Sequence, residues 1–199
     1  MSPPLSPRQR LAEFLGGSGP TAIVGVGNED RGDDGFGPAA VALLGQKLGD
    51  VKALVAPVVL IDAGIRPENC LEAVAAAGAA RVLFVDAAAT THRPMAPGHR
   101  AGHPGLIWLD PGELVGTSVS SHRLPLPLVA ALLRVETEAA EAAVLAYPIE
   151  DGEAATARFS PLSAAGRAAA EAAAELLAGE IRRRWDSDPR GGDGPPRHA

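Results

Sequence analysis

Short apolar runs alternate with longer segments of helical periodicity along most of this chain. The short runs are rich in β-branched residues, which is typical of buried strands. They cover residues 21–26, 58–61, 81–85, 106–109 and 143–147. The longer segments predict helices over residues 38–48, 67–77, 126–134 and 161–185, the last with a Ser-Pro start. This alternation predicts a three-layer α/β/α fold with a mainly parallel, twisted five-stranded sheet.

Proline and glycine gather at both ends of the chain, outside this alternation. We therefore expect a flexible N-terminal extension over residues 1–19, with at most a short helix around residues 11–15. Residues 186–199 have no apolar pattern and are expected to be a disordered tail. Between the two ends, residues 20–185 are expected to form a single α/β domain.

The charge and cysteine content of the 199-residue chain restrict its partners. Lys and Arg number 18 against 24 Asp and Glu, a net charge of -6, so the electrostatic attraction that drives binding to nucleic acid or anionic membranes is missing. The single cysteine, Cys70, excludes an intramolecular disulfide and is expected to pack in the core. No apolar run has membrane-spanning or signal-peptide length, so we expect a cytoplasmic protein with no membrane partner. We also expect it to be a monomer.

A glycine-rich loop follows the first predicted strand. It begins like a dinucleotide-binding loop, but Asp30 stands where the third glycine of that fingerprint belongs. Carboxylates around a pyrophosphate would repel it, so the acidic run instead suits a cation. Asp33 or Asp34 alternatively caps the following helix. The residues expected to set the geometry of this loop are Gly25, Gly27, Asn28, Asp33 and Gly35.

Carboxylates also follow the next two predicted strands, where Asp62 and Asp86 stand. A lone Asp in such a place often forms a turn. Parallel strands, however, bring their carboxyl ends to one edge, which would place both near Asp34. His122 lies in a polar loop before an apolar helix. Two carboxylates and an imidazole can hold a divalent metal or carry out acid and base chemistry.

Other catalytic schemes fit the sequence less well. Ser120 and Ser121 lack the Gly-x-Ser-x-Gly elbow of a serine hydrolase. Three histidines, His92, His99 and His103, lie in a Pro- and Gly-rich segment over residues 90–105 without a positioned carboxylate or cysteine. That segment is interpreted as a solvated insertion.

At these residues the sequence resembles the hydrogenase maturation proteases, endopeptidases that trim the C-terminal extension from the large-subunit precursor of nickel-iron hydrogenases. The resemblance runs over residues 22–184. Its motifs lie at residues 25–28, 32–38, 61–64, 67–69 and 83–87, and at Ser121 and His122 with Leu124 and Leu128 downstream. It implies a phosphorylase/hydrolase-like α/β fold.

The resemblance also implies roles for individual residues. Asp34, Asp86 and His122 fall on the family's metal-contacting and catalytic positions, and Asp62 and Gly64 fall on its substrate-recognition loop. The metal would be nickel already installed in the precursor, so that it marks the substrate. The chain departs from the family pattern at Ala63, where glycine is usual, and at Asp30, where an apolar residue is usual.

The expected reaction is therefore aspartic-type or metal-assisted hydrolysis of the precursor. Capture of the nickel would place the scissile peptide, and the metal or a carboxylate would activate water. No activated Ser or Cys is evident, so no acyl-enzyme is expected. Two alternatives stay open: a non-catalytic nickel-binding hydrogenase assembly factor, and a nucleotide-dependent enzyme that uses the loop at Gly25.

Overall fold

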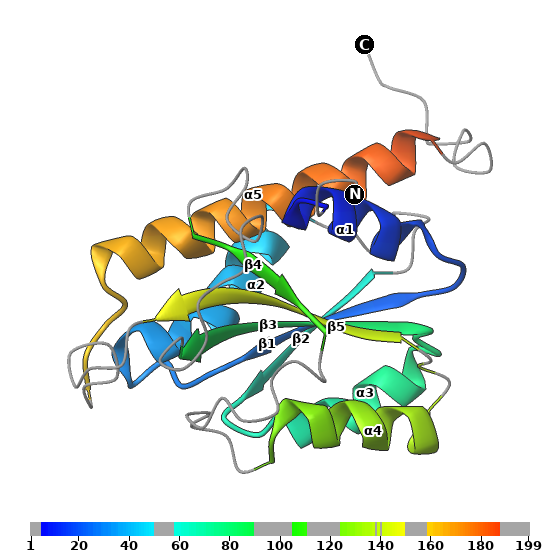
Figure 1. The fold of residues 1–199 in the computed structure, drawn as a ribbon, viewed down its shortest axis with the longest axis horizontal. Helices are drawn as coiled ribbons and strands as arrows, with labels where there is room; N and C mark the ends of the chain where they lie inside the picture. Colours follow the sequence, from blue (N-terminus) through cyan, green and yellow to red (C-terminus); the bar gives the residue numbers. More distant parts are fainter. Residues whose placement is uncertain are drawn as a thin grey trace.

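Five strands form one sheet whose faces are both covered by helices (Figure 1). The computed structural model describes residues 5–49, 58–89, 105–110, 124–137, 139, 141–149 and 159–187. The strands are β1 (Thr21–Val26), β2 (Val58–Gly64), β3 (Arg81–Ala89), β4 (Ile107–Leu109) and β5 (Glu141–Ile149). Their order in the sheet is β2-β1-β3-β5-β4. The predicted three-layer α/β/α fold is confirmed.

The sheet is parallel except at one edge. β1 pairs in parallel with β2 and β3, and β3 pairs in parallel with β5. β4 is a three-residue edge strand that runs antiparallel to β5. Parallel neighbours cannot be joined by a tight turn, so helices connect the parallel strands along the chain.

The helices divide between the two faces of the sheet (Figure 1). They are α1 (Pro7–Gly16), η1 (Gly32–Gly35), α2 (Phe36–Leu48), η3 (Pro67–Asn69), α3 (Cys70–Ala76), α4 (Leu126–Glu136) and α5 (Ala164–Ser187). Helices α1, α2 and α5 cover one face, whereas α3 and α4 cover the other. None of the helices described here is long and apolar enough to cross a bilayer.

The central strands are apolar on both sides because both of their faces are covered. In β3, Leu83 and Val85 belong to the core that contains α1, α2 and α5. Val82 and Phe84 belong to the core on the side of α3 and α4. All four side chains are fully buried. This double burial explains why the strand is an unbroken apolar run in the sequence.

The N-terminal segment is a docked helix, so the expectation of a flexible extension is wrong for this segment. Ser6 and Gln9 form a reciprocal capping box, and Pro7 occupies the first turn. Leu11 and Leu15 are buried in the core against α5. The predicted end of the domain at residue 185 is close to the end of α5 at Ser187, and residues 188–199 lie outside the described residues.

Arginine side chains fix the chain where α1 ends. The buried guanidinium of Arg81 donates to the carbonyl oxygens of Gly17, Ser18 and Gly19 over 2.6 to 2.9 Å. Arg184 donates to the Gly17 carbonyl as well, at 2.8 Å. Burial lowers the pKa of Arg81, while the carboxylate of Glu141 acts in the opposite direction. Carbonyl oxygens that have no donor within α1 thus accept hydrogen bonds from side chains of β3 and α5.

Shortening Leu11 should strongly destabilise the protein. The side chain is fully buried between α1 and the core, so Leu11→Ala should lower the free energy of unfolding by about 2–5 kcal/mol in a urea titration. Leu5→Ala is the control, because Leu5 is 40% exposed, and it should change that free energy by less than about 0.5 kcal/mol. Equal, small effects of the two variants would show that α1 is not docked in solution.

Cys70 should be unreactive in the folded protein. It is fully buried at the start of α3, as expected from the sequence, and burial raises the pKa of its thiol from 9.0 to about 11. A thiol-specific reagent should therefore label the native protein far more slowly than the urea-unfolded chain. Because the unfolded thiol ionises first, stability should fall as the pH rises from 9 towards 11. Fast labelling of the native protein would contradict this burial.

Candidate functional site at the carboxyl ends of the strands

Asp86 lies where the pairing between β1 and β3 stops. The last β1–β3 pair is Gly25 with Val85, whereas β3 continues along β5 as far as Ala89. The sequence placed Asp86 after the end of its strand, but it lies inside β3, one residue beyond that last pair. Its side chain is buried, and it alternates in register with Val82 and Phe84, on the side of α3 and α4.

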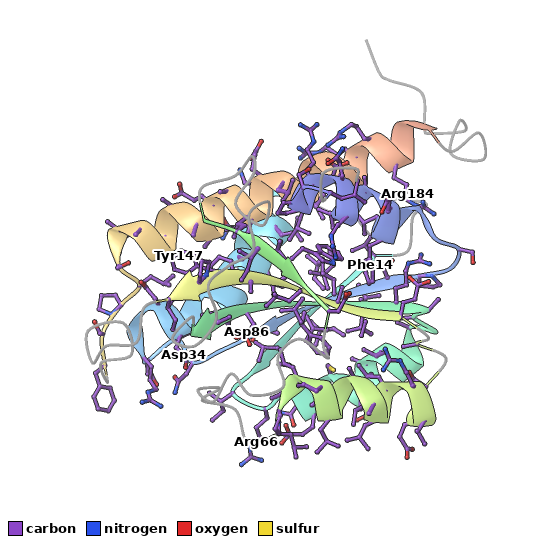
Figure 2. The ribbon with its side chains drawn as sticks, viewed as in Figure 1. Phe14, Asp34, Arg66, Asp86, Tyr147 and Arg184 are labelled. Carbon is purple, nitrogen blue, oxygen red and sulfur yellow. The ribbon has the colours of Figure 1, made fainter. Side chains whose placement is uncertain are left out.

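Asp34 approaches the same end of the sheet from the short helix η1. Its side chain is buried, and η1 contacts β3. Just beyond, Gly37 in the first turn of α2 touches the carbonyls of Val26 and Val85, so that a Cβ there would overlap both oxygens. Figure 2 shows Asp34 and Asp86 at the end of the sheet towards which β1, β3 and β5 run. The structure therefore brings these two predicted site residues to one edge.

The loop between β1 and η1 is held in shape by its own backbone. Gly27 has φ of 146°, and a Cβ at that position would overlap the carbonyl oxygen of Asp34. The Asn28 amide donates to that same oxygen at 3.2 Å, and the Asn28 side chain accepts from the Asp30 amide at 3.0 Å. Gly25 and Gly35 also lie close to neighbouring backbone, within 3 Å of where a Cβ would stand. These contacts fix the position of the backbone that carries Asp34 at this end of the sheet.

Asp33 binds the residue that directly precedes helix α5. Its two carboxylate oxygens accept from the amide and the hydroxyl of Ser163, at 2.7 and 2.8 Å, just before α5 begins. The alternative in which Asp33 or Asp34 caps the following helix is wrong, because α2 has no side-chain cap. Burial raises the pKa of Tyr147, and the Asp33 carboxylate adds to that shift. Asp33 thus joins the loop after β1 to the last helix.

Asp62 and Gly64 form a turn at the end of β2 rather than a buried pair with Asp34. Asp62 is exposed, and its carboxylate accepts from the Gly64 amide at 2.9 Å. The Gly64 carbonyl in turn accepts from the Gly27 amide at 2.9 Å, which ties this turn to the loop after β1. The register shift beside Gly25 leaves Ala63 unpaired, and the Ala63 side chain is buried. Ala63 has one methyl group more than the glycine that is usual in the family, and this methyl group fills space in the core.

The third predicted ligand, His122, lies outside the described residues, as do Ser120, Ser121 and the histidines at 92, 99 and 103. Among the residues that the structure does describe, no three His, Cys, Asp or Glu side chains are grouped closely enough to hold a metal ion. The structure thus brings Asp34 and Asp86 to one edge of the sheet, and a metal site that they form with His122 stays a prediction.

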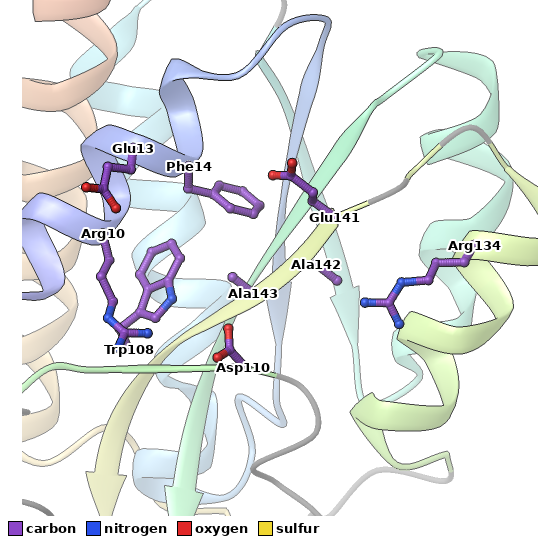
Figure 3. Close-up of a pocket in the computed structure, with 9 residues that line it drawn as sticks. All are labelled: Arg10, Glu13, Phe14, Trp108, Asp110, Arg134, Glu141, Ala142 and Ala143. Carbon is purple, nitrogen blue, oxygen red and sulfur yellow. The ribbon is translucent and has the colours of Figure 1, made fainter. Parts of the chain in front are cut away.

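A separate pocket lies away from these carboxylates, towards the amino end of β5 (Figure 3). Its volume is about 390 Å³. The lining combines charged side chains with an aromatic pair: Arg10, Glu13, Phe14, Trp108, Asp110, Arg134, Glu141, Ala142 and Ala143. The rings of Phe14 and Trp108 meet edge to face, 5.5 Å between centroids. Since Asp34 and Asp86 lie at the carboxyl ends of the strands, this pocket is not part of their site.

Comparison with known proteins identifies relatives of the fold. No family model and no curated protein matches the chain. A crystal structure of a [NiFe] hydrogenase maturation protease HycI from Thermococcus kodakarensis KOD1 matches with a TM-score of 0.67 and 29% identity, over 87% of this chain and 99% of that one. The solution structure of an endopeptidase HycI from Escherichia coli matches with a TM-score of 0.57 and 25% identity, over 86% and 93% of the two chains. Both matches extend over nearly the whole relative.

Proposed function

We propose that this chain, whose fold matches those of solved hydrogenase maturation proteases, is an endopeptidase acting on a nickel-iron hydrogenase large-subunit precursor. It would remove the C-terminal extension of that precursor. One observation carries the proposal: two buried carboxylates, Asp34 and Asp86, lie at one edge of the sheet in a fold matched by such proteases.

The residues fit a nickel ion that arrives with the precursor. Carboxylate oxygens and an imidazole nitrogen are suitable ligands for divalent nickel, and Asp34, Asp86 and His122 would supply them. Two carboxylates shielded from water attract a cation more strongly than exposed ones do, because the local dielectric constant is lower. The nickel would therefore mark a precursor that is ready to be cleaved.

The role of the chain would be to position the peptide. Holding the ion between Asp34 and Asp86 would bring the adjoining scissile bond to a fixed place, which lowers the entropic part of the barrier. A bound divalent ion supplies Lewis-acid polarisation, and a carboxylate near it is a candidate base for the attacking water. The exposed turn at Asp62 and Gly64 would contact the precursor near the site.

Mixing the purified protein with nickel-loaded and with nickel-free precursor tests this function. We expect a small mobility shift on a gel, confirmed by mass spectrometry, for the nickel-loaded form alone. Cleavage of both forms would remove the dependence on nickel. Cleavage of neither would refute the endopeptidase for that precursor, and tight binding without cleavage would favour an assembly factor. Gel filtration of the same samples also tests the predicted monomer.

A further inference from the structure

Phe159 combines two unfavourable properties. Its side chain is 86% exposed, so the ring gains nothing from burial in the core. Its φ is 58°, and among the described residues it is the one non-glycine residue in the left-handed region. A bulky side chain rarely adopts that conformation, because the Cβ approaches the following carbonyl. The exposed ring and the left-handed φ of Phe159 are therefore both unfavourable for the stability of the fold.

Hydrogen bonds on both sides nevertheless hold Phe159 in place beside the loop that leads to Asp34. The Phe159 amide donates to the Asp30 carbonyl at 2.5 Å, and the Gly32 amide donates to the Ser160 carbonyl at 2.8 Å. Ser160 and Arg31 form an isolated parallel bridge. A few residues later, Ser163 is bound by the Asp33 carboxylate. The position of the Phe159 backbone is thus fixed relative to η1, which carries Asp34.

We propose that Phe159 is a docking residue for the polypeptide chain of the precursor, which its ring contacts through an apolar side chain next to the site. This inference rests on the function proposed above. Backbone strain persists where the surrounding structure imposes it, and it concentrates at functional sites. A chain that delivers its nickel to Asp34 would lie close to the loop after β1, because this loop leads directly to Asp34 and the Phe159 backbone is bound to it. Aromatic side chains, Phe among them, are enriched at protein–protein interfaces relative to the rest of the surface.

A second exposed apolar residue supports a protein partner at this edge. Ile65 is 45% exposed and directly follows the turn formed by Asp62 and Gly64, which is bonded to the loop after β1. Phe159 and Ile65 therefore come from two segments, far apart in the sequence, that are both tied to that loop. An extended peptide that crosses this edge would cover apolar surface from both segments.

Cleavage kinetics on the nickel-loaded precursor test the docking. Phe159→Ala should raise KM about tenfold, as expected for the loss of one aromatic anchor, and should change kcat less than about twofold. The matched control is Val135→Ala, since Val135 is 79% exposed in the last turn of α4, and it should leave both constants unchanged. Phe159→Tyr retains the ring and should restore KM. An unchanged KM in Phe159→Ala would overturn the proposal.

A glycine variant separates docking from folding. Phe159→Gly removes the ring and also relieves the left-handed strain, so its KM should rise as in Phe159→Ala while its Tm stays at or above that of the wild type. If gel filtration shows a wild-type dimer that dissociates on this substitution, the ring is covered by a second copy and the proposal is wrong.

Binding measurements separate the failure of this inference from the failure of the proposed function. If the wild type does not cleave the precursor, the Kd for the nickel-loaded precursor is measured with wild type and with Phe159→Ala. A Kd about tenfold weaker in the variant would retain the docking and reject the endopeptidase. Equal Kd values, or no binding by the wild type, would overturn the docking.

Discussion

Asp34→Asn should abolish cleavage of the precursor and leave the protein folded. The amide has nearly the same volume as the carboxylate but carries no charge, so the buried ligand proposed for the incoming cation is lost. Changing a residue that only supports a metal ligand typically reduces metal affinity or activity by about 10- to 100-fold. Loss of a ligand itself should therefore reduce the cleavage rate by about 100-fold or more. Initial rates on the nickel-loaded precursor measure this effect, and Asp86→Asn should behave in the same way.

A distant carboxylate provides the matched control for this experiment. Glu171→Gln makes the same change of charge on the exposed side of α5 and should leave the rate unchanged. Far-ultraviolet circular dichroism and Tm of each variant verify the fold. His122→Ala should also abolish cleavage without unfolding. Wild-type rates in Asp34→Asn and Asp86→Asn would show that these carboxylates do not act in the reaction.

Gly37→Ala should be among the most destabilising single substitutions in this fold. The first turn of α2 rests directly on the ends of β1 and β3, and the new methyl would overlap the carbonyl oxygens of Val26 and Val85. Backbone cannot move aside as a flexible side chain can, so helix and strands must separate. We expect the free energy of unfolding to fall by about 3 kcal/mol or more, measured by urea titration.

The same substitution elsewhere should have the opposite effect. Gly179 lies inside α5, and a Cβ at that position would have no neighbour within 4 Å. Gly179→Ala should therefore raise the free energy of unfolding by about 0.5–1 kcal/mol, because alanine loses less backbone entropy in a helix. If Gly37→Ala were equally harmless, the contact between α2 and the two strands would not exist in solution.

Much of the fold could be predicted because its central strands are buried on both faces. Apolar runs in β1, β3 and β5 mark such strands, and the repeat in α5 marks a helix that covers them. The antiparallel direction of β4 has no signal in a run of three residues. Helix α1 did have one: Ser6 followed by Gln9 is a capping box, which the surrounding prolines and glycines concealed.

The site was less predictable because it depends on contacts between distant segments. The meeting of Asp34 and Asp86 follows from strand order, since parallel strands end at one edge. The partner of Asp33 is 130 residues away, and no local pattern indicates it. The left-handed backbone of Phe159 is likewise imposed by its bonds to another loop. The part assigned to His122 remains a prediction, because that residue lies outside the described residues.

The contact between α1 and α5 has a consequence for the synthesis of the protein. The Arg8 guanidinium binds the buried Glu180 carboxylate at 3.0 Å across 172 residues of sequence. During synthesis on the ribosome, α1 is made long before α5, so Leu11 and Leu15 lack their final partners until α5 has emerged. This face of the sheet is therefore completed last, and the nascent chain exposes apolar surface that a chaperone would recognise.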